Sequence, residues 1–475
     1  MPTPPKILIL SIGCSLILGC ATEKYEAKPL NVGQTTAKML AKDVATPDFQ
    51  AYLITQGVKQ EDLPFKSWGL DELTLCALYF NPKLDVAKAQ LGLANAQIES
   101  AGIKQNPTLN GNLAHSNLAN GDKRPWAYGL NVEISIETAS KRAIKIEEAQ
   151  ANAAASRMDI ASQAWQLRSQ IAQTLIERQQ NLADTQLLQT TLAAQTEIAN
   201  MLEKRVDKGL AAKTELSTAQ LAQLKTQSDL NNTQAKAAEI QARLANDVGL
   251  SLEKFKQLTI KPLEIDAALS QQTSTLSTDF VSKNLQETAL LNRIDIRRAL
   301  SKYAASEAKI KLEVAKQTPD IALTPGIAFE YGDSIWSLGF STLLNLLHKN
   351  PTQINEAKQL REVEGAQFEA LQAQIIGDLN QHYAAFTAAK QNLNHAQSQY
   401  TSQLQHMQKL QKQFDAGLID RLELRQASLT NIISQQQVFT AKFSLLKAAH
   451  EIQDVLQKPL YTDFVMPNWK PWIKN

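Results

Sequence analysis

The fold of this chain is decided by two matching glycine turns, Val206-Asp207-Lys208-Gly209-Leu210 and Phe414-Asp415-Ala416-Gly417-Leu418. Each turn separates two stretches without glycine or proline: residues 130–208 and 210–248 around the first, 378–416 and 418–458 around the second. Because glycine and proline are the residues that most often interrupt helices, the pattern predicts two long helical hairpins. At ~1.5 Å per residue, a helix filling most of 130–208 would be on the order of 100 Å long, which is too long for an ordinary globular domain.

The hairpins belong to two copies of one larger unit, which we place at residues 71–249 and 284–458. Asn106-Pro107-Thr108-Leu109 corresponds to Thr318-Pro319-Asp320-Ile321, and Trp126-Ala127-Tyr128-Gly129-Leu130 to Trp336-Ser337-Leu338-Gly339-Phe340. The first two segments are 212 positions apart, the second two are 210 apart, and the glycine turns are 208 apart, so only small insertions or deletions separate the copies. Each copy is predicted to run helix, strand, strand, long helix, turn, helix. The opening helices are expected over residues 85–104 and 299–316.

Between the helices of each copy, apolar residues alternate with polar or small ones, as in β-strands. The pattern covers residues 128–136 and 321–331, with shorter runs at 109–113 and 336–340. It suits a membrane β-barrel, which faces lipid on one side and a polar lumen on the other, but a small soluble sheet with one buried face would give the same alternation.

Four strands cannot close a barrel, and open strand edges are not tolerated in lipid. If these are membrane strands, several chains must contribute to one barrel, and three chains would supply twelve strands. Asn131 would then face the lumen. The residues expected to face lipid are Leu130, Val132, Ile134, Leu323, Ile327 and Leu338.

The N-terminus is predicted to be an export signal over residues 1–19. Lys6 precedes an apolar run, residues 7–19, that is too short to span a bilayer. The run ends in Leu16-Ile17-Leu18-Gly19-Cys20, which resembles a bacterial lipobox, so Cys20 is the expected site of lipid modification. Ordinary cleavage nearby is the alternative. Ala21 follows Cys20 where an Asp would be needed to retain a lipoprotein in the inner membrane, and this resemblance implies the outer membrane.

Composition and motifs argue against several other classes of function. The formal net charge is +2, with 49 basic and 47 acidic residues interspersed, so no nucleic-acid partner is expected. The cysteines supply neither a disulfide framework nor a zinc motif, and Cys76 is expected to be a small buried apolar residue. The six histidines form no ligand-spaced pair, so neither a metal site nor a cofactor is predicted. No phosphate loop, nucleophile elbow or dinucleotide fingerprint is present, so no catalytic residue is assigned and an enzyme is the least favoured class.

The residues as a set resemble the TolC-like outer-membrane efflux proteins. The resemblance covers nearly the whole mature chain, residues 65–460, and rests on the paired turns together with Trp68-Gly69-Leu70-Asp71-Glu72-Leu73, Asn81-Pro82 and Asn106-Pro107-Thr108-Leu109. It implies a mainly α protein with a β region. Three chains would form a twelve-stranded β-barrel, four strands per chain, continuous with a long periplasmic α-helical barrel. Segments outside the two repeats, residues 20–70, 250–283 and 459–475, would form an equatorial belt.

The same resemblance implies a partner set and a group of site residues. An inner-membrane pump, of the resistance-nodulation-division type, would deliver substrates through a periplasmic membrane-fusion adaptor, and the channel would conduct them passively across the outer-membrane lipid. The adaptor would dock at the two hairpin tips, which correspond to Gly209, Leu210 and Ala211, and to Gly417, Leu418 and Ile419.

Charged residues beside the tips are candidates for a periplasmic gate. At the acidic position just past each turn, where family members often carry Asp, this chain has Glu215 and Glu423. Arg421 and Lys213 could pair with nearby acids to hold the mouth shut, and Asp420 completes the set. The alternative for each of these charges is a solvated helix face.

Several functions stay open at the level of the sequence. The spacing around Asn81-Pro82 and Pro351-Thr352-Gln353 resembles the branch that serves pumps of the cobalt-zinc-cadmium type, so metal cations stand beside drugs as substrates. A type I secretion duct in the outer membrane is a further alternative. A non-channel periplasmic coiled-coil scaffold or adaptor is another, although adaptors typically carry one hairpin flanked by lipoyl-like β segments and this chain carries two.

Overall fold

The computed structural model describes residues 23–117, 125–275, 290, 293–330, 332–343 and 348–457. The chain divides into two compact units, Met1–Lys42 and Asp43–Asn475, which are described separately. In the first unit, α2 (Val32–Leu40) is capped by Asn31, whose side chain accepts a hydrogen bond from the Gln34 amide at 3.1 Å. The predicted signal peptide, residues 1–19, and Cys20 lie outside the described residues.

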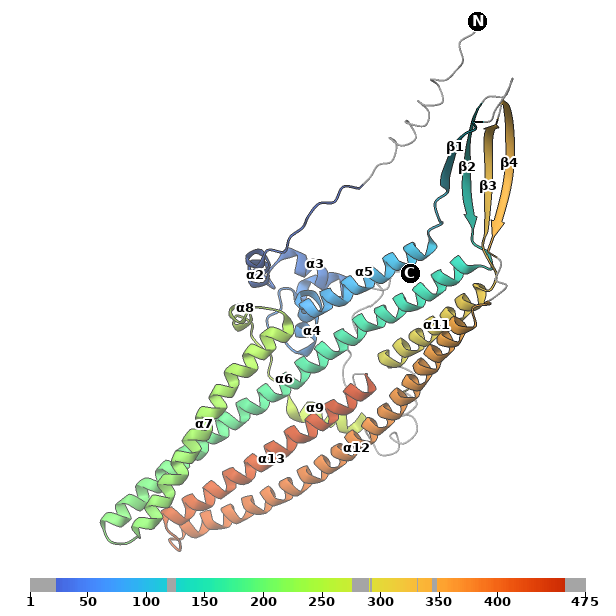
Figure 1. Cartoon of the computed structure of the whole chain (residues 1–475). Helices are drawn as coiled ribbons and strands as arrows, with labels where there is room; N and C mark the ends of the chain where they lie inside the picture. The colour runs from blue at the N-terminus through green and yellow to red at the C-terminus, as the bar shows by residue number, and fades with distance from the viewer. Residues whose placement is uncertain are drawn as a thin grey trace. The chain divides into compact units, whose positions relative to one another are not determined.

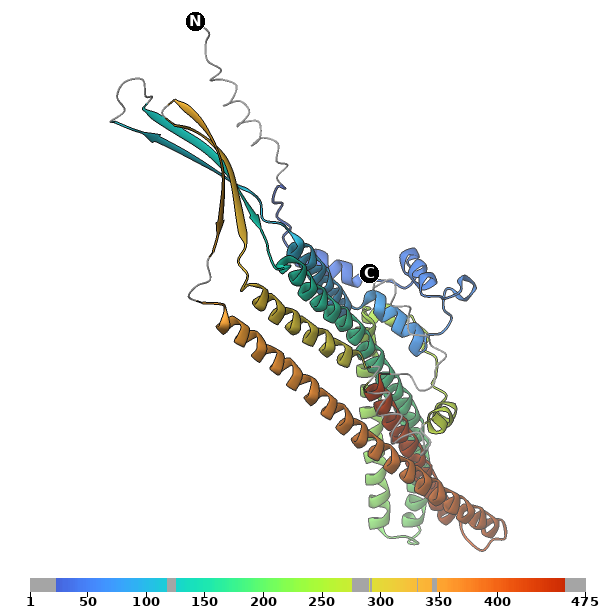
Figure 2. The same ribbon diagram turned by 90° about the vertical axis from the view of Figure 1, so that its right-hand side faces the viewer.

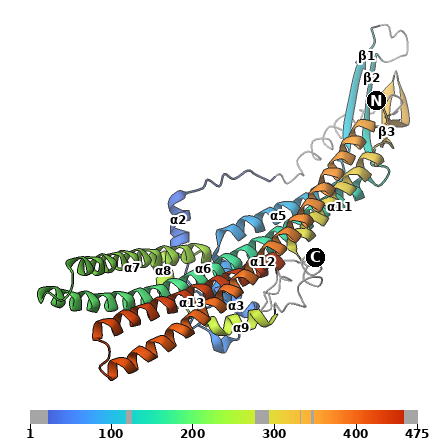
Figure 3. The same ribbon diagram turned by 90° about the horizontal axis from the view of Figure 1, so that it is seen from below.

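Long helices dominate the second unit, as the stretches without glycine and proline predict (Figure 1). α6 (Lys141–Asp207) and α7 (Lys213–Val248) form one hairpin, and α12 (Pro351–Asp415) and α13 (Arg421–Leu456) form the other. α6 has 67 residues and α12 has 65, a difference that accounts for the change in repeat spacing from 210 to 208 at the turns. Seen from below, the two hairpins lie side by side, with α13 packed on α6 (Figure 3). None of the helices in the described ranges combines the length and the apolar character needed to cross a bilayer.

Each copy opens with a helix that begins earlier than the sequence pattern indicates. α5 (Pro82–Gly102) starts at Pro82, directly after its N-cap Asn81, whose side chain accepts a hydrogen bond from the Lys83 amide at 3.0 Å. Proline suits the first helical position because its missing N–H has no partner there in any case. α11 (Ile294–Ala315) opens the second copy.

Four strands form one antiparallel sheet in the order β1-β2-β3-β4: β1 (Thr108–His115), β2 (Trp126–Ile136), β3 (Ile321–Glu330) and β4 (Asp333–Thr342). The turn between β3 and β4 is tight, since Glu330 pairs directly with Asp333. Within this unit the sheet lies at one end of the long helices and the glycine turns lie at the other (Figures 1 and 2).

Residues outside the repeats pack around the middle of the long helices. They include α3 (Pro47–Thr55), η1 (Gln60–Asp62), α8 (Leu252–Lys256) and α9 (Ile265–Thr275), and α4 (Leu70–Phe80), at the start of the first repeat, packs with them. Trp68 pairs with Ile260 in an isolated parallel bridge, which joins the two described equatorial segments. A buried cluster holds α3, α4 and α8 against α6 and α7; its members include Phe49, Leu53, Trp68, Cys76, Ile171, Ile240, Leu244 and Phe255. α9 packs instead in a second cluster with residues of α12 and α13. Cys76, in the first cluster, is therefore a buried apolar residue, as predicted, while the tail 459–475 lies outside the described residues.

Candidate functional site

The register of the sheet places its apolar residues on one face. Leu130 is opposite Ile327, which is opposite Trp336. Ile134 is four residues after Leu130 in β2, so its side chain points to the same side of the sheet. Neighbouring residues on adjacent strands point to the same side of a sheet. All of the residues expected to face lipid share this side, which we call the apolar face: Leu130, Val132, Ile134, Leu323, Ile327 and Leu338. Asn131, paired with Gly326, lies on the other side, as predicted.

The apolar face is open along the edge strand β4. Trp336 is 80% exposed and Phe340 is 78% exposed, and no element in the described ranges covers them. Large apolar residues exposed together mark a surface that contacts protein or lipid. A soluble sheet would bury this face against a core, so the arrangement disfavours the soluble alternative.

The opposite face of the sheet is polar and lined with small residues. The Asn110 side chain donates a hydrogen bond to the Asn131 side chain at 3.1 Å. A Cβ added to Gly129 would lie 2.5 Å from Asn112 Oδ1, and one added to Gly339 would lie 2.5 Å from Thr324 Oγ1. These glycines thus leave room for polar side chains of neighbouring strands. The strands carry no Lys or Arg, and their acids, Glu133, Glu330 and Asp333, share this polar face.

A partly buried ion pair joins the sheet to the helices. The Lys141 Nζ donates hydrogen bonds to the Thr318 carbonyl at 2.6 Å and to Asp320 Oδ1 at 2.7 Å. Asp320 also accepts a hydrogen bond from the Thr138 amide at 2.8 Å. These contacts fix the first residues of α6 to the segment that leads into β3.

The long helices of both copies begin after a non-glycine residue in the left-handed conformation. Ser140 precedes α6 with φ 55°, and Asn350 precedes α12 with φ 56°. They occupy equivalent positions of the two copies. The Asn350 side chain donates hydrogen bonds to the Glu313 carbonyl at 3.0 Å and to Glu313 Oε2 at 2.9 Å. These bonds hold the backbone in place directly before α12.

The two hairpin tips have the same backbone geometry. Gly209 has φ +69° and Gly417 has φ +72°, a left-handed conformation that glycine adopts without steric cost. At each tip the residue after the glycine donates its amide to a carbonyl five residues earlier, Leu210 to Arg205 at 2.7 Å and Leu418 to Gln413 at 2.9 Å. Leu210 is 72% exposed and Leu418 is 74% exposed. Of the other predicted tip residues, Ala211 and Ile419 are partly buried.

Asp420 links the two tips. Its side chain caps α13 by accepting hydrogen bonds from the Leu422 amide at 2.8 Å and the Glu423 amide at 3.0 Å. It also forms an ion pair with Arg205 of α6, with 2.7 Å between Arg205 Nη2 and Asp420 Oδ2. The Arg205 hydrogen bond, followed by the capping amides, lowers the pKa of the Asp420 carboxyl. A second ion pair, Arg425 to Glu197 at 2.8 Å, lies further from the tips.

The remaining gate candidates do not pair within the protomer. Lys213, Glu215, Arg421 and Glu423 are exposed, and within the described part of the chain none of them forms an ion pair. Pairing of Lys213 or Arg421 with nearby acids to hold the mouth shut stays a prediction. The partner that sequence reasoning missed is Arg205, which the first copy carries where the second has Gln413. That difference between copies is the signal that could have indicated it.

A second group of charges, from α4, α6 and α13, surrounds the buried side chain of Arg168. Trp165 Nε1 donates a hydrogen bond to Asp454 Oδ1 at 2.7 Å, and the Arg168 guanidinium lies 5.9 Å from the centre of the Trp165 ring. Arg168, only 3% exposed, faces Asp71 with 3.7 Å between Nη2 and Oδ1. Burial raises the pKa of Asp71, against the opposing effect of the Arg168 charge.

His450 of α13 is buried beside this group. Its Nε2 lies 3.2 Å from both the hydroxyl and the carbonyl oxygen of Ser169 on α6. Burial lowers the pKa of His450; Asp454 and Glu451 oppose this shift and Arg168 adds to it. Burial thus favours the neutral imidazole, against the raising effect of the Ser169 hydrogen bond.

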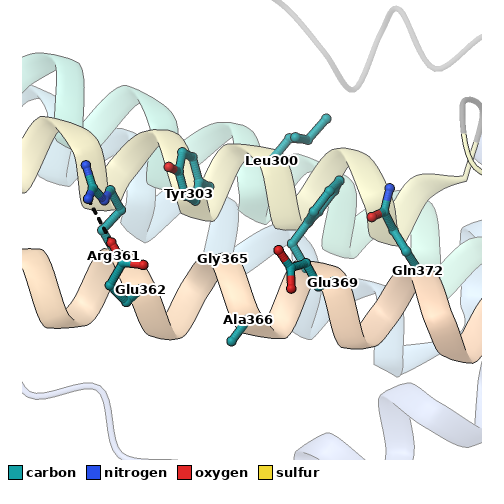
Figure 4. Close-up of a pocket in the computed structure, with 9 residues that line it drawn as sticks. Leu300, Tyr303, Arg361, Glu362, Gly365, Ala366, Glu369 and Gln372 are labelled. Atoms are coloured by element: carbon teal, nitrogen blue, oxygen red, sulfur yellow. Dashed lines mark hydrogen bonds and ion pairs between the residues drawn. The ribbon is translucent and has the colours of Figure 1, made fainter.

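A groove between α11 and α12 is one candidate for small-molecule binding (Figure 4). The Tyr303 ring lies beside Gly365, where an added Cβ would be in ordinary van der Waals contact with Tyr303 Cε2 at 3.8 Å. Arg361 on the groove wall is paired with Glu362 at 2.7 Å and Glu307 at 3.3 Å. In the described ranges no group of three or more His, Cys, Asp or Glu residues is placed to hold a metal ion.

Comparison with known proteins supports the resemblance. Residues 76–250 match the family model described as "Outer membrane efflux protein". The chain is 21% identical over 408 residues to an uncharacterized protein of Haemophilus influenzae, covering 79% of this chain and 87% of that protein. It is also 21% identical over 387 residues to "Toxin and drug export protein A" of Aggregatibacter actinomycetemcomitans, covering 78% and 82% of the two chains.

Solved structures confirm the fold. The outer membrane protein VceC of Vibrio cholerae has a TM-score of 0.65 at 17% identity, covering 82% of this chain and 97% of its own. CusC has a TM-score of 0.66 at 19% identity, covering 85% and 97%. The chain thus has the TolC-like fold, with its four-stranded sheet, long helical hairpins and two repeats, and the resemblance to TolC-like outer-membrane efflux proteins is confirmed. The matches support an efflux-channel role and indicate the outer membrane, and the matched family comprises efflux proteins rather than enzymes.

Proposed function

We propose that this chain is one subunit of a homotrimeric outer-membrane channel in a tripartite efflux system. The observation that carries the proposal is the sheet: one face is apolar and open, the other is polar, and both edge strands lack a partner within the described part of the chain. Three copies would pair their edges into twelve strands, an even number within the range of membrane barrels. Closure removes the open edges that lipid does not tolerate.

The distribution of surfaces along the second unit supports a duct that reaches from the outer membrane into the periplasm. The sheet stands at one end of the long helices and the hairpin tips stand at the other (Figure 1). Leu210 and Leu418 present exposed apolar side chains at the two tips. We infer that these tips dock a periplasmic membrane-fusion adaptor, which receives substrate from an inner-membrane pump of the resistance-nodulation-division type.

The ion pair between Arg205 and Asp420 supports a gate at the same end. It joins the first hairpin to the second, so it holds the two tips of one subunit together. The exposed charges Lys213, Glu215, Arg421 and Glu423 would then be available to pair between subunits or to line the mouth. We propose further that Cys20 is lipid-modified and anchors each subunit, since the lipobox pattern precedes it.

The trimer and its location are tested together. The protein, expressed with its own signal, should fractionate with the outer membrane and migrate as a trimer that heating converts to monomer. Reconstituted into planar bilayers, it should conduct ions. A monomer in the soluble periplasmic fraction would instead favour the scaffold alternative and would remove the channel proposal.

Export of a polypeptide or a drug is the second candidate for the substrate, beside metal cations. It is favoured by the similarity to a relative named for toxin and drug export. Deletion of the gene should then sensitise cells to drugs, or reduce the secreted protein, without changing resistance to zinc, cobalt or cadmium salts. The opposite pattern would support metal cations.

A further inference from the structure

The groove between α11 and α12 is a cavity of about 530 Å³ that the channel proposal does not use. Pockets that hold small organic molecules typically measure about 300–1,000 Å³. One wall is formed by α11 and the other by α12 (Figure 4). Among the residues that line it are Leu300 and Tyr303 of α11 and Arg361, Glu362, Phe368 and Glu369 of α12. The groove therefore combines two aromatic rings with charged groups and has room for a small organic ligand.

The apolar part of the lining is held in place by its surroundings. Phe368 packs against the buried cluster that α12 forms with α9 and α13. The Tyr303 ring lies beside Gly365, whose missing side chain leaves the space next to the ring open. Leu300 is 51% exposed, so solvent reaches the apolar lining. A flat apolar molecule in the groove would cover this surface and gain from its removal from water.

Negative charge exceeds positive charge at the groove. Arg361 is the only base among the described residues that line it, and its guanidinium is paired with Glu362 at 2.7 Å and with Glu307 at 3.3 Å. Glu369 is exposed on the same wall and forms no ion pair within the described part of the chain. One guanidinium thus faces three carboxylates, and the carboxylate of Glu369 is left over.

The same place in the first copy has neither these charges nor an aromatic ring beside a glycine. Counterparts lie 212 positions earlier in α5 and 210 earlier in α6. Tyr303 corresponds to Leu91 and Gly365 to Ala155, and both of these are buried. The ion-pair group has uncharged counterparts, which are Asn95 for Glu307, Ala151 for Arg361 and Asn152 for Glu362. Helix packing does not require the charges, since α5 and α6 pack together without them.

One acid is present in both copies but is paired in only one of them. Glu369 corresponds to Asp159 of α6, which forms an ion pair with Arg298 at 2.5 Å. In the groove the equivalent carboxylate stands free of any such pair in the described ranges, beside the aromatic lining. A carboxylate makes strong charge-assisted hydrogen bonds, and the faces of aromatic rings attract cations. This combination suits a positively charged ligand.

From these observations we propose that the groove between α11 and α12 binds an organic cation with an aromatic body. The Glu369 carboxylate pairs with the positive charge of the ligand, and Tyr303 and Phe368 contact its rings. Arg361 does not repel the ligand, because two carboxylates balance its charge. The inference goes beyond the proposed function and does not depend on it, since both walls of the groove belong to one subunit.

Ethidium, a planar aromatic cation, is the probe that tests this site. Titration of the purified full-length protein, followed by fluorescence anisotropy, should show saturable binding. Gly365→Leu extends a side chain into the groove beside Tyr303 and should abolish binding, and leucine also favours the helix more than glycine does. Gly377→Leu is the matched control: Gly377 is exposed in α12, does not line the groove, and has nothing within 4 Å of an added Cβ.

A second pair of variants tests the charge of the ligand. Glu369→Gln keeps the shape of the side chain and should weaken ethidium binding about tenfold, the loss expected for one charge-assisted contact. Glu356→Gln, at an exposed position of α12 outside the groove lining, should bind as the wild type does. An anionic aromatic dye, anilinonaphthalene sulfonate, should not displace ethidium. Circular dichroism and heat-modifiable trimer are measured for every variant.

The outcomes separate the groove from the channel. An unmodified protein without saturable binding overturns the proposal, as does equal affinity in Gly365→Leu and Gly377→Leu, which would place ethidium elsewhere. Loss of binding in Gly365→Leu without any effect of Glu369→Gln overturns the preference for cations. Trimer and conductance are scored on the same samples. A protein that binds ethidium in the groove but neither assembles nor conducts supports this inference and refutes the proposed function.

Discussion

A charge on the apolar face is the most direct perturbation of the proposed barrel. Val132 lies near the middle of the 11-residue strand β2, opposite Leu109. An arginine at the bilayer midplane on the lipid side of a barrel strand costs about 2–4 kcal/mol. In a trimer Val132→Arg occurs three times, so the cost is about 6–12 kcal/mol per assembly. Per subunit this corresponds to a change of about 30- to 700-fold in the assembly equilibrium.

The neighbouring position supplies the control. Asn131→Arg adds the same charge one residue away but on the polar face, where its main loss is the hydrogen bond with Asn110, worth about 0.5–1.5 kcal/mol. Outer-membrane trimer is quantified by immunoblot of unheated membrane fractions at matched expression. Val132→Arg should abolish most of the trimer while Asn131→Arg retains it. Equal amounts of trimer from the two variants would refute the assignment of the apolar face to lipid.

Further predictions concern the hairpin tips, the equatorial region and the N-terminus. Leu210→Asp with Leu418→Asp should reduce crosslinking to the cognate adaptor and export-dependent resistance while the trimer persists; normal capture and resistance would sink the docking assignment. Asp420→Asn keeps a capping side chain but removes the charge that pairs with Arg205, in an exposed ion pair worth about 0–1 kcal/mol. Thermal stability should therefore change little, while single-channel conductance should rise because the two tips are no longer held together. An unchanged conductance would argue against a gate there. Burial lowers the pKa of His450, so the unfolded chain takes up a proton near pH 6.5 while the folded chain does so only at lower pH. The stabilisation that depends on the neutral imidazole is therefore present above pH 6.5 and is lost as the pH falls below it. The melting temperature of the trimer should drop more steeply toward about pH 5 in the wild type than in His450→Gln, and parallel plots of melting temperature against pH would contradict this. Intact-mass measurement should find a lipid-sized increment on Cys20, and an unmodified N-terminus beyond this residue would exclude the anchor.

Sequence reasoning succeeded where the signal is local. Gly209 and Gly417 mark turns because the backbone there needs a positive φ, which glycine permits. The alternation in β2 and β3 predicted the two faces correctly, since side chains of a strand point to opposite sides in turn. Helix starts were placed less well: the run of periodic residues in α5 begins after Pro82, but capping by Asn81 extends the helix to that proline.

Contacts between distant residues required the structure. The ion pair of Arg205 with Asp420 joins residues 215 positions apart, and that of Lys141 with Asp320 joins residues 179 apart. Neither pair has a spacing that a helix or strand would indicate. Lys213 and Arg421 carry the same charge close to the tips, yet neither pairs with an acid in the described part of the protomer. Which basic residue meets an acid depends on how the two hairpins pack.

Local sequence patterns were enough to predict the duplicated unit, the long helical hairpins, the tight turns and the two-faced strands. These features follow from backbone preferences and side-chain periodicity, which act between residues near one another in the chain. Three features could be seen only in the folded protein: the open apolar face of the sheet, the ion pair by which Arg205 joins the tips, and the exposure of Leu93 where its counterpart Ala305, 212 positions later, is buried. Burial and ion pairing depend on which elements pack side by side, and equivalent helices of the two copies have different neighbours, since α11 packs on both α6 and α12 whereas α5 packs on α6.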